Sequence, residues 1–156
     1  MKKIKKALIS VSDKKNLKQL LKVLTKHEIE LISSGGTYKE IKKLKFECLE
    51  VSEFTRFPEI LDGRVKTLHP KIHAGILSKR NKKSHNKDLK KHNFEEIDLV
   101  IVNFYPFEKT LEQTNNHVKI MENIDVGGPT MVRAAAKNYN DVTVITSSDQ
   151  YSELIN

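Results

Sequence analysis

The feature that most constrains the fold of this chain is a regular alternation of short apolar segments with longer amphipathic ones. The apolar segments are rich in Val, Ile and Leu and predict strands at 6–11, 28–34, 46–51, 98–104 and 141–146. Helices are expected between them, at 16–27, 35–44, 86–94, 129–138 and from 147 onward. Such alternation favours right-handed crossovers between parallel strands, with helices on both faces of the sheet. The sequence therefore predicts a three-layer α/β/α domain with a parallel sheet.

Three local signals support these helices. The 16–27 segment carries a leucine stripe at helical spacing, formed by Leu17, Leu20, Leu21 and Leu24. Pro129 stands in the first turn of its expected helix, a position that favours proline. Ser147 and Gln150 have the spacing of a capping box and predict the start of the last helix.

The length of 156 residues suits one domain, and no repeat or linker divides residues 1–156. The chain stops soon after its last helix begins, so we expect a domain cut short at its C-terminus. The basic start precedes an apolar run too short for a signal peptide, and the run at 99–102 is too short to span a bilayer. The single cysteine, Cys48, has apolar neighbours and is interpreted as a core residue. Together these features favour a cytoplasmic protein without a membrane partner.

The net charge of +8 admits three interpretations: a nucleic-acid binder, an enzyme for phosphorylated substrates, or a bias toward lysine. The most basic segment, 79–92, contains no aromatic residue that could stack on a base. We interpret it as a solvated surface helix with its loop, and we expect no nucleic-acid partner.

Polar residues and glycines follow the first two expected strands, where an open parallel sheet binds its ligands. Ser10, Ser12 and Lys14 surround the first junction. The second junction contains Ser33, Ser34, Gly35, Gly36 and Thr37. Glycines let the backbone approach an anion, and helix-start N–H groups and hydroxyls donate to it, although the same residues serve as ordinary caps. The pair of junctions favours a phosphate site, but no dinucleotide or ATP-type glycine motif is present.

Two later junctions carry further candidates. Asn103 and Tyr105 follow the fourth strand; alternatively, this is a simple Tyr-Pro turn with its phenylalanines in the core. Asp125 precedes two glycines at the start of the next expected helix. It is either a site residue or an ordinary cap of that helix. Arg133 and Lys137 share one face of that helix. Their positive charges repel each other, so they must be either exposed to solvent or neutralised by an acid or a ligand.

The segment "LDGRVKTLHPKIHAGIL", residues 61–77, is the least regular part of the chain, since it fits neither a strand nor a helix. It is either a solvated basic loop or a binding loop for an anion. His69 and His73 have the spacing of a zinc pair on a helix, but Pro70 separates them and no third ligand lies nearby. We therefore expect no metal.

Several of these motifs together resemble a known family. "SVSDK", "SSGGT", "GRVKTLHP", "NFYPF", "IDVGG" and "RAAAKN" look like the inosine monophosphate (IMP) cyclohydrolase domain of bifunctional purine biosynthesis proteins. The resemblance runs from about Ala7 to the end of the chain. It implies a methylglyoxal-synthase-like fold, a homodimer, and no metal or cofactor. The transformylase domain of that family is absent, so no formyl transfer is expected.

The resemblance also implies a reaction and a site. The reaction closes 5-formamidoimidazole-4-carboxamide ribotide to IMP with loss of water. The residues expected to bind the ribotide are Ser10, Ser12, Lys14, Ser34, Gly35, Gly36, Thr37, Arg64, Thr67, Asn103 and Gly127. The residues expected at the reacting centre are Lys66, Tyr105, Asp125 and Lys137.

Our hypothesis for the chemistry gives each of these four residues a role. Asp125 orients the carboxamide and helps to remove its proton. Lys66 and Lys137 flank Asp125, stabilise the developing oxyanion and assist the loss of water. Tyr105 makes a hydrogen bond near the formyl group. On this hypothesis the 61–77 segment is a binding loop, basic because its ligand is anionic.

Three rival functions stay open. A methylglyoxal synthase would share the fold but would carry a His-Asp pair where this chain has "SVSDK". A ligand-sensing module, like the allosteric domain of large carbamoyl-phosphate synthases, would need only the phosphate site. A nucleic-acid binder would show affinity for unrelated duplexes that falls steeply with salt.

Overall fold

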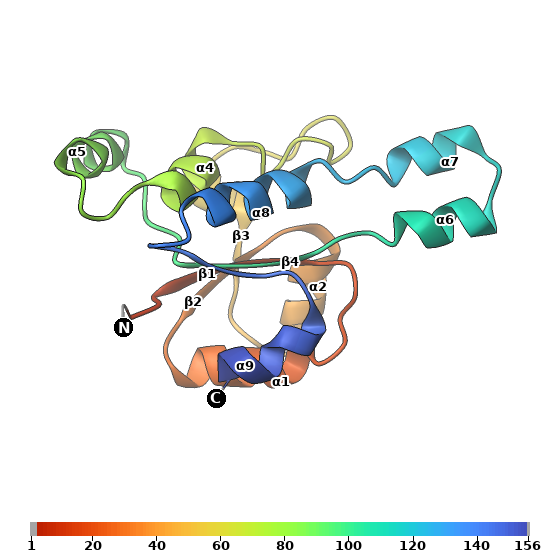
Figure 1. Ribbon diagram of the computed structural model, residues 1–156, viewed down its shortest axis with the longest axis horizontal. Helices are drawn as coiled ribbons and strands as arrows, with labels where there is room; N and C mark the ends of the chain where they lie inside the picture. Colours follow the sequence, from red (N-terminus) through yellow and green to blue (C-terminus); the bar gives the residue numbers. More distant parts are fainter. Residues whose placement is uncertain (1–2, 156) are drawn as a thin grey trace.

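The computed structural model describes residues 3–155 and shows a five-stranded sheet between two layers of helices (Figure 1). The strands are β1 (Lys6–Val11), β2 (Glu30–Ser33), β3 (Leu49–Glu50), β4 (Leu99–Asn103) and β5 (Thr143–Ile145). Their order across the sheet is β3-β2-β1-β4-β5, and every pairing is parallel. The predicted three-layer α/β/α architecture is confirmed.

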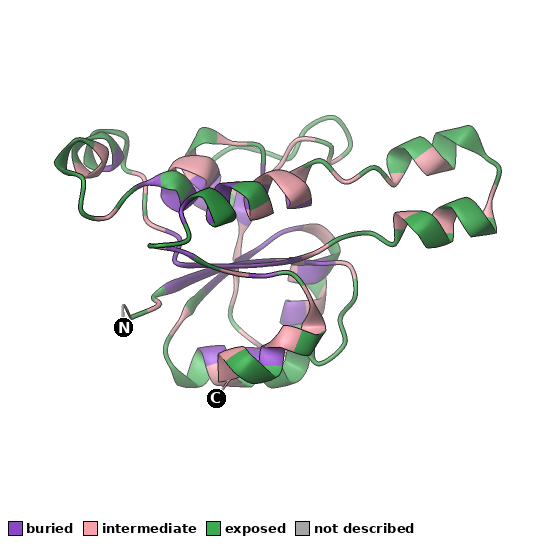
Figure 2. Ribbon diagram, in the orientation of Figure 1, coloured by how far each residue is buried: buried purple, intermediate pink, exposed green. Residues whose placement is uncertain are grey.

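Strand β1 occupies the centre of the sheet because both of its faces are apolar. Its Ala7 pairs with Leu31 of β2 on one side and with Leu99 of β4 on the other. Leu8 and Ile9 point to opposite faces and are both fully buried. Figure 2 shows the resulting band of buried residues along the sheet.

The helices that cover the sheet form two separate hydrophobic clusters with it. One cluster packs under α1 (Leu17–Lys26), α2 (Gly35–Lys43) and α9 (Tyr151–Ile155), and it contains the predicted leucine stripe. The other packs under α3 (Val51–Thr55), α4 (Pro70–Leu77) and α8 (Gly127–Lys137).

The smaller elements lie outside these two clusters. The basic α5 (Lys83–His92) has Leu89 as its buried residue, which confirms the predicted surface helix. The 3-10 turn η1 (Ser148–Gln150) begins with the predicted Ser147/Gln150 capping box. In the part of the chain that the structure covers, no helix is both long and apolar enough to cross a bilayer.

Three local predictions were wrong. Residues 46–51 form only the two-residue β3, because α3 begins directly at Val51. The 61–77 segment is irregular only as far as His69. Pro70 then occupies the first turn of α4, where it needs no N–H partner, and His69 caps the helix.

The third wrong prediction concerns 107–122, for which no helix was expected. Two short helices, α6 (Phe107–Gln113) and α7 (His117–Glu122), project from the carboxyl side of the sheet (Figure 1). Neither contains a buried residue, so neither has the apolar stripe from which a helix is predicted. Phe104 is exposed and Phe107 is half-buried, so neither is a core residue, contrary to the alternative of a turn with its phenylalanines in the core.

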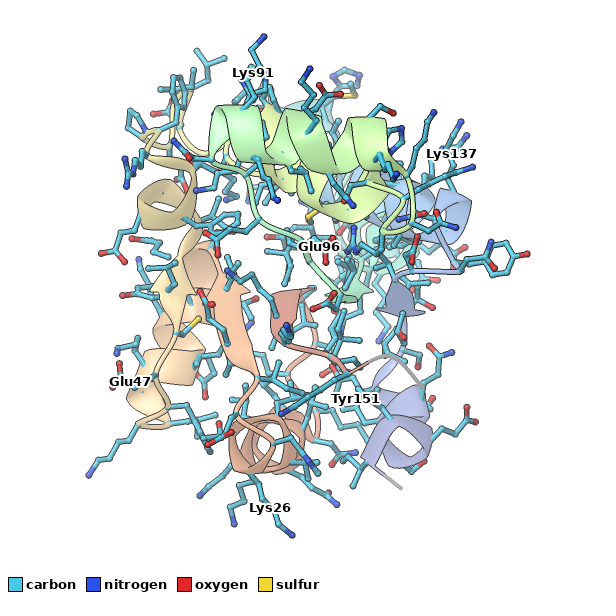
Figure 3. All side chains as sticks on the ribbon, turned by 90° about the vertical axis from the view of Figure 1, so that its left-hand side faces the viewer. Lys26, Glu47, Lys91, Glu96, Lys137 and Tyr151 are labelled. Atoms are coloured by element: carbon cyan, nitrogen blue, oxygen red, sulfur yellow. The ribbon has the colours of Figure 1, made fainter. Side chains whose placement is uncertain are left out.

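A charged network closes the amino end of the sheet. Lys6 is buried, and its ammonium lies 2.5 Å from Glu95 and 3.0 Å from Glu30. Asp98 accepts hydrogen bonds from the backbone of Lys6 and its neighbour, and it lies 3.7 Å from the Arg80 guanidinium. Arg80 also pairs with Glu96, which Figure 3 shows between α5 and the strands.

We expect Cys48 to be unreactive in the folded chain. It packs against the cluster under α1 and α2, and burial raises the pKa of its thiol to about 12. Since the thiolate is the reactive form, alkylation by iodoacetamide at pH 8 should be about 1000-fold slower than in the urea-unfolded chain. Equal rates in the two states would show that the thiol is accessible and ionised.

Candidate functional site

The loop after β1 is held by Asn103 at the end of the neighbouring strand β4. The Asn103 amide oxygen accepts from the backbone N–H groups of Ser12 (2.6 Å) and Asp13 (2.9 Å), and its nitrogen donates to the Asp13 carbonyl. The Lys14 ammonium donates to the carbonyls of Val11 and Ser12. Asn103 is thus a fixed part of the rim, and Lys14 brings positive charge to the end of β1.

The start of α2 is tied to the same strand end. The Thr37 hydroxyl donates to the Val11 carbonyl (2.9 Å) and accepts from the Val11 N–H (3.0 Å). Its hydroxyl proton is therefore already used in the free protein. Ser34, at the N-cap, makes no side-chain cap to the helix, so the first amides of α2 remain available to an anion.

The basic loop, residues 56–69 between α3 and α4, crosses this helix start and places Lys66 over it. The Lys66 ammonium lies 3.5 Å from the point where a β-carbon on Gly35 would stand. It lies 3.7 Å from the Glu59 carboxylate, at the beginning of the same loop. A bridge between Ile60 and Val65 closes the loop, which turns at Gly63 with a φ of +87°.

The other end of the loop contacts the start of α8. Thr67 is buried, and its hydroxyl lies only 2.7 Å from where a β-carbon on Gly127 would stand. Asp125 accepts a hydrogen bond of 2.9 Å from the Gly128 N–H, so it caps α8, as the alternative interpretation proposed. The cap uses one carboxylate oxygen of a half-exposed side chain. The loop therefore joins the starts of α2 and α8 at one rim of the sheet.

The glycines at the start of α8 allow this close approach. A β-carbon at Gly128 would lie 2.5 Å from Oδ2 of Asp125 and 3.1 Å from the Val102 side chain. We expect Gly128→Ala to destabilise the fold by about 1–3 kcal/mol in urea denaturation, because the Asp125 carboxylate that the added carbon would meet is held by its hydrogen bond to the Gly128 N–H. Gly36→Ala is the matched control, since no atom lies within 4 Å of its β-carbon position. Equal losses in both variants would contradict this explanation.

Two predicted residues lie apart from this cluster or point elsewhere. Lys137 is the last residue of α8, and the ten residues from Gly127 carry it about 15 Å along the helix. In Figure 1, α8 begins toward the side of the molecule that carries α6 and α7 and ends toward the opposite side. Figure 3, seen from that opposite side, shows Lys137 pointing outward. The prediction that Lys137 flanks Asp125 is therefore wrong within one chain. Arg64 pairs with Glu122 of α7.

The remaining predicted residues line the rim less closely. Tyr105 stands after β4 with an exposed side chain. Ser10 is half-buried in the last part of β1. Sequence reasoning missed Glu59 and Glu122, the anionic partners of the loop. Glu59 could have been found from its place in the loop, whereas Glu122 lies on the unpredicted α7.

Within residues 3–155, no three His, Cys, Asp or Glu side chains are grouped so that they could hold a metal ion. His69 caps α4 through its ring nitrogen, which accepts from the Lys71 N–H at 3.1 Å. The reactive groups at the rim are accordingly ammonium, carboxylate and hydroxyl side chains together with helix-start amides.

These features define an open parallel α/β domain with ammonium groups and uncapped helix-start amides at one rim. Residues 16–130 match the MGS-like domain family, and the chain belongs to that family. It is 50% identical over 150 residues to the bifunctional purine biosynthesis protein PurH of Prochlorococcus marinus subsp. pastoris, and 51% identical over 152 residues to that of Clostridium perfringens SM101.

These alignments cover 96% and 97% of this chain but only 29% and 30% of the two relatives. The chain thus spans less than a third of the length of these relatives, and the part shared is the MGS-like domain. The crystal structure of ForH superposes with a TM-score of 0.84 at 30% identity. That superposition covers 97% of this chain and 78% of ForH.

Proposed function

We propose that this chain carries IMP cyclohydrolase activity, the closure of 5-formamidoimidazole-4-carboxamide ribotide to IMP. The observation that supports it most is the placement of the basic loop. Lys66 lies over the start of α2, and Thr67 lies against the start of α8, beside Asp125. The relatives of this chain are named bifunctional purine biosynthesis proteins, which agrees with a ribotide substrate.

The phosphate of the ribotide fits the start of α2. The first amides of this helix have no side-chain cap, and no protein atom lies within 4 Å of the Gly36 β-carbon position. Lys66 supplies positive charge over the helix start, and Lys14 supplies it at the end of β1, to which Thr37 of α2 is bonded. Helix-start amides and nearby ammonium groups together favour a dianionic ligand.

The reacting end of the ribotide then lies toward Asp125. The carboxamide nitrogen attacks the formyl carbon, a C–N bond forms, and the nitrogen loses a proton while the formyl oxygen takes up one to become a hydroxyl. The C–O bond then breaks: the hydroxyl takes up a second proton and leaves as water, and the former formamide nitrogen gives up its proton as the ring C=N bond forms. Asp125 accepts the proton from the nitrogen with the carboxylate oxygen that does not cap α8. Lys66 stabilises the charge that develops on the formyl oxygen, and Tyr105 donates to the same oxygen.

Lys137 takes part in this proposal only through a second copy of the chain. Because it stands at the far end of α8, it would have to come from the partner in the homodimer that the family resemblance implies. The cytoplasmic location and the lack of a cofactor belong to the same proposal. Sedimentation of the purified protein tests the dimer.

The direct test is turnover. We expect the purified protein to convert the formamide ribotide to IMP, followed by the change in ultraviolet absorbance, and Asp125→Asn to slow it at least about 100-fold. Lys39→Ala, which removes an exposed charge from α2, should leave the rate unchanged. IMP binding without turnover would contradict the proposal and favour a ligand-sensing domain. Release of methylglyoxal from dihydroxyacetone phosphate would favour the other enzyme of this fold.

A further inference from the structure

The two histidines with the sequence spacing of a metal pair lie where the basic loop joins α4, His69 at the N-cap and His73 within the helix. His69 is the N-cap of α4. Its ring Nδ1 accepts a hydrogen bond from the Lys71 N–H at 3.1 Å, and its backbone N–H donates to the Thr67 carbonyl at 2.9 Å. Its ring also contacts Phe57, with the ring centroids 5.7 Å apart. His69 therefore joins the loop to α4 through both its backbone and its side chain.

His73 stands one helical turn further along α4, on the same face as His69. Its ring makes a hydrogen bond to the backbone of Thr67, the residue that His69 also contacts. Its Nε2 is buried, with no hydrogen-bond partner among the described residues. The His73 ring and the His69 backbone N–H therefore meet at Thr67, while the His69 ring caps the helix that follows the loop.

The residue that they hold is central to the rim. Thr67 packs against the start of α8, 2.7 Å from the Gly127 β-carbon position, and Lys66 directly precedes it. Since Thr67 is buried and its neighbours on α8 are in close contact, a shift of its backbone must also move the Lys66 ammonium. Displacement of a catalytic group by about 1 Å is enough to cost a large factor in rate.

We propose that His69 and His73 are positioning residues: the His73 ring holds Thr67, and the His69 ring holds the end of the loop to the start of α4, so that together they keep the Lys66 ammonium over the start of α2. Neither histidine needs to touch the ligand. The role of Lys66 in this inference rests on the proposed function, whereas the placement of the loop by the histidines does not.

The protonation state of the two rings agrees with this role. Burial and the nearby Lys71 charge lower the pKa of His69, and burial lowers the pKa of His73. A neutral His69 ring keeps Nδ1 as an acceptor for the Lys71 N–H, which a protonated ring could not do.

The test compares His69→Ala with His69→Asn. Asparagine is a good N-cap whose side-chain oxygen can replace Nδ1 as the acceptor, whereas alanine has none. We expect His69→Ala to lower the rate of IMP formation about 10-fold or more, and His69→Asn to recover most of that loss. An unchanged rate in His69→Ala, or equal losses in both variants, would overturn the inference for His69.

His73→Leu tests the second histidine, because it keeps a similar volume and removes only the polar ring atoms. We expect the same direction of effect on the rate, with unchanged secondary structure by circular dichroism. Full activity in this variant would show that His73 only fills the core.

Hydrogen exchange of the free protein separates this inference from the proposed function. If the histidines hold the loop, the amides of residues 66–72 exchange faster in His69→Ala and in His73→Leu, and close to the wild-type rate in His69→Asn. This result is independent of any ligand. Failure of the wild type to form IMP would refute the proposed function alone, while identical exchange in all the proteins would refute the positioning role alone.

Discussion

Replacing Lys66 by alanine should lower the rate of IMP formation by about 100- to 1000-fold, with a smaller effect on the affinity for the ribotide. The Lys66 ammonium lies over the start of α2, 3.7 Å from Glu59, and is half-buried by the loop. A cation held there stabilises charge that appears on the formyl oxygen only in the transition state. Loss of such a group acts on turnover more than on ground-state binding.

Two comparisons make the Lys66 result specific. Lys66→Arg retains the charge but not the compact ammonium, and we expect it to recover only part of the rate. Lys39→Ala removes one positive charge from the exposed side of α2 and should have little effect, which excludes a general effect of net charge. Wild-type turnover in Lys66→Ala would contradict the assignment, whereas equal loss in Lys39→Ala would indicate long-range attraction of the substrate.

The sequence predicted the sheet well because its central strands are buried on both faces. Strands such as β1 and β4 then appear as continuous apolar runs between amphipathic helices, and their parallel pairing follows from the crossovers. The leucine stripe of α1 was found for the same reason, since burial of one face sets its spacing.

Elements that bury little could not be predicted in this way. Strand β3 has two half-buried residues, and α6 and α7 have none buried, so hydrophobic periodicity carries no signal there. The start of α4 was missed because a proline suggested an interruption, although proline suits a first turn. His69 completes that start through a cap that is evident only from the folded backbone.

The candidate site was predicted where it depends on strand ends and not where it depends on helix length. Asn103, Thr37 and Lys14 follow adjacent strands, so their meeting at one rim follows from the topology. Asp125 and Lys137 stand at opposite ends of one helix, and the helical rise alone separates them. Helix length is a quantity that the sequence supplies, so this separation could have been foreseen.

Replacing Asp98 by alanine should destabilise the fold by about 3–5 kcal/mol, measured as the free energy of unfolding in urea. The buried carboxylate accepts from the backbone N–H groups of Lys5 (3.0 Å) and Lys6 (3.2 Å), and it faces the Arg80 guanidinium. Its removal leaves two donors at the start of β1 without this acceptor, and it takes one carboxylate away from the buried Arg80 cation, which also pairs with Glu96. Asp98→Asn should cost less, since its amide oxygen can still accept from the backbone.

The exposed Asp88→Ala on α5 is the matched control and should change the free energy of unfolding by less than about 0.5 kcal/mol. Combining Asp98→Ala with Arg80→Met should cost less than the sum of the two single changes, because the guanidinium that loses its Asp98 partner is then gone. Additive losses would show that Arg80 and Asp98 act independently.

The network closes the amino end of the sheet, while the basic loop lies at the carboxyl end. Asp98→Ala should therefore leave the rate of IMP formation per folded molecule unchanged, unlike Lys66→Ala, which should lower the rate and spare stability.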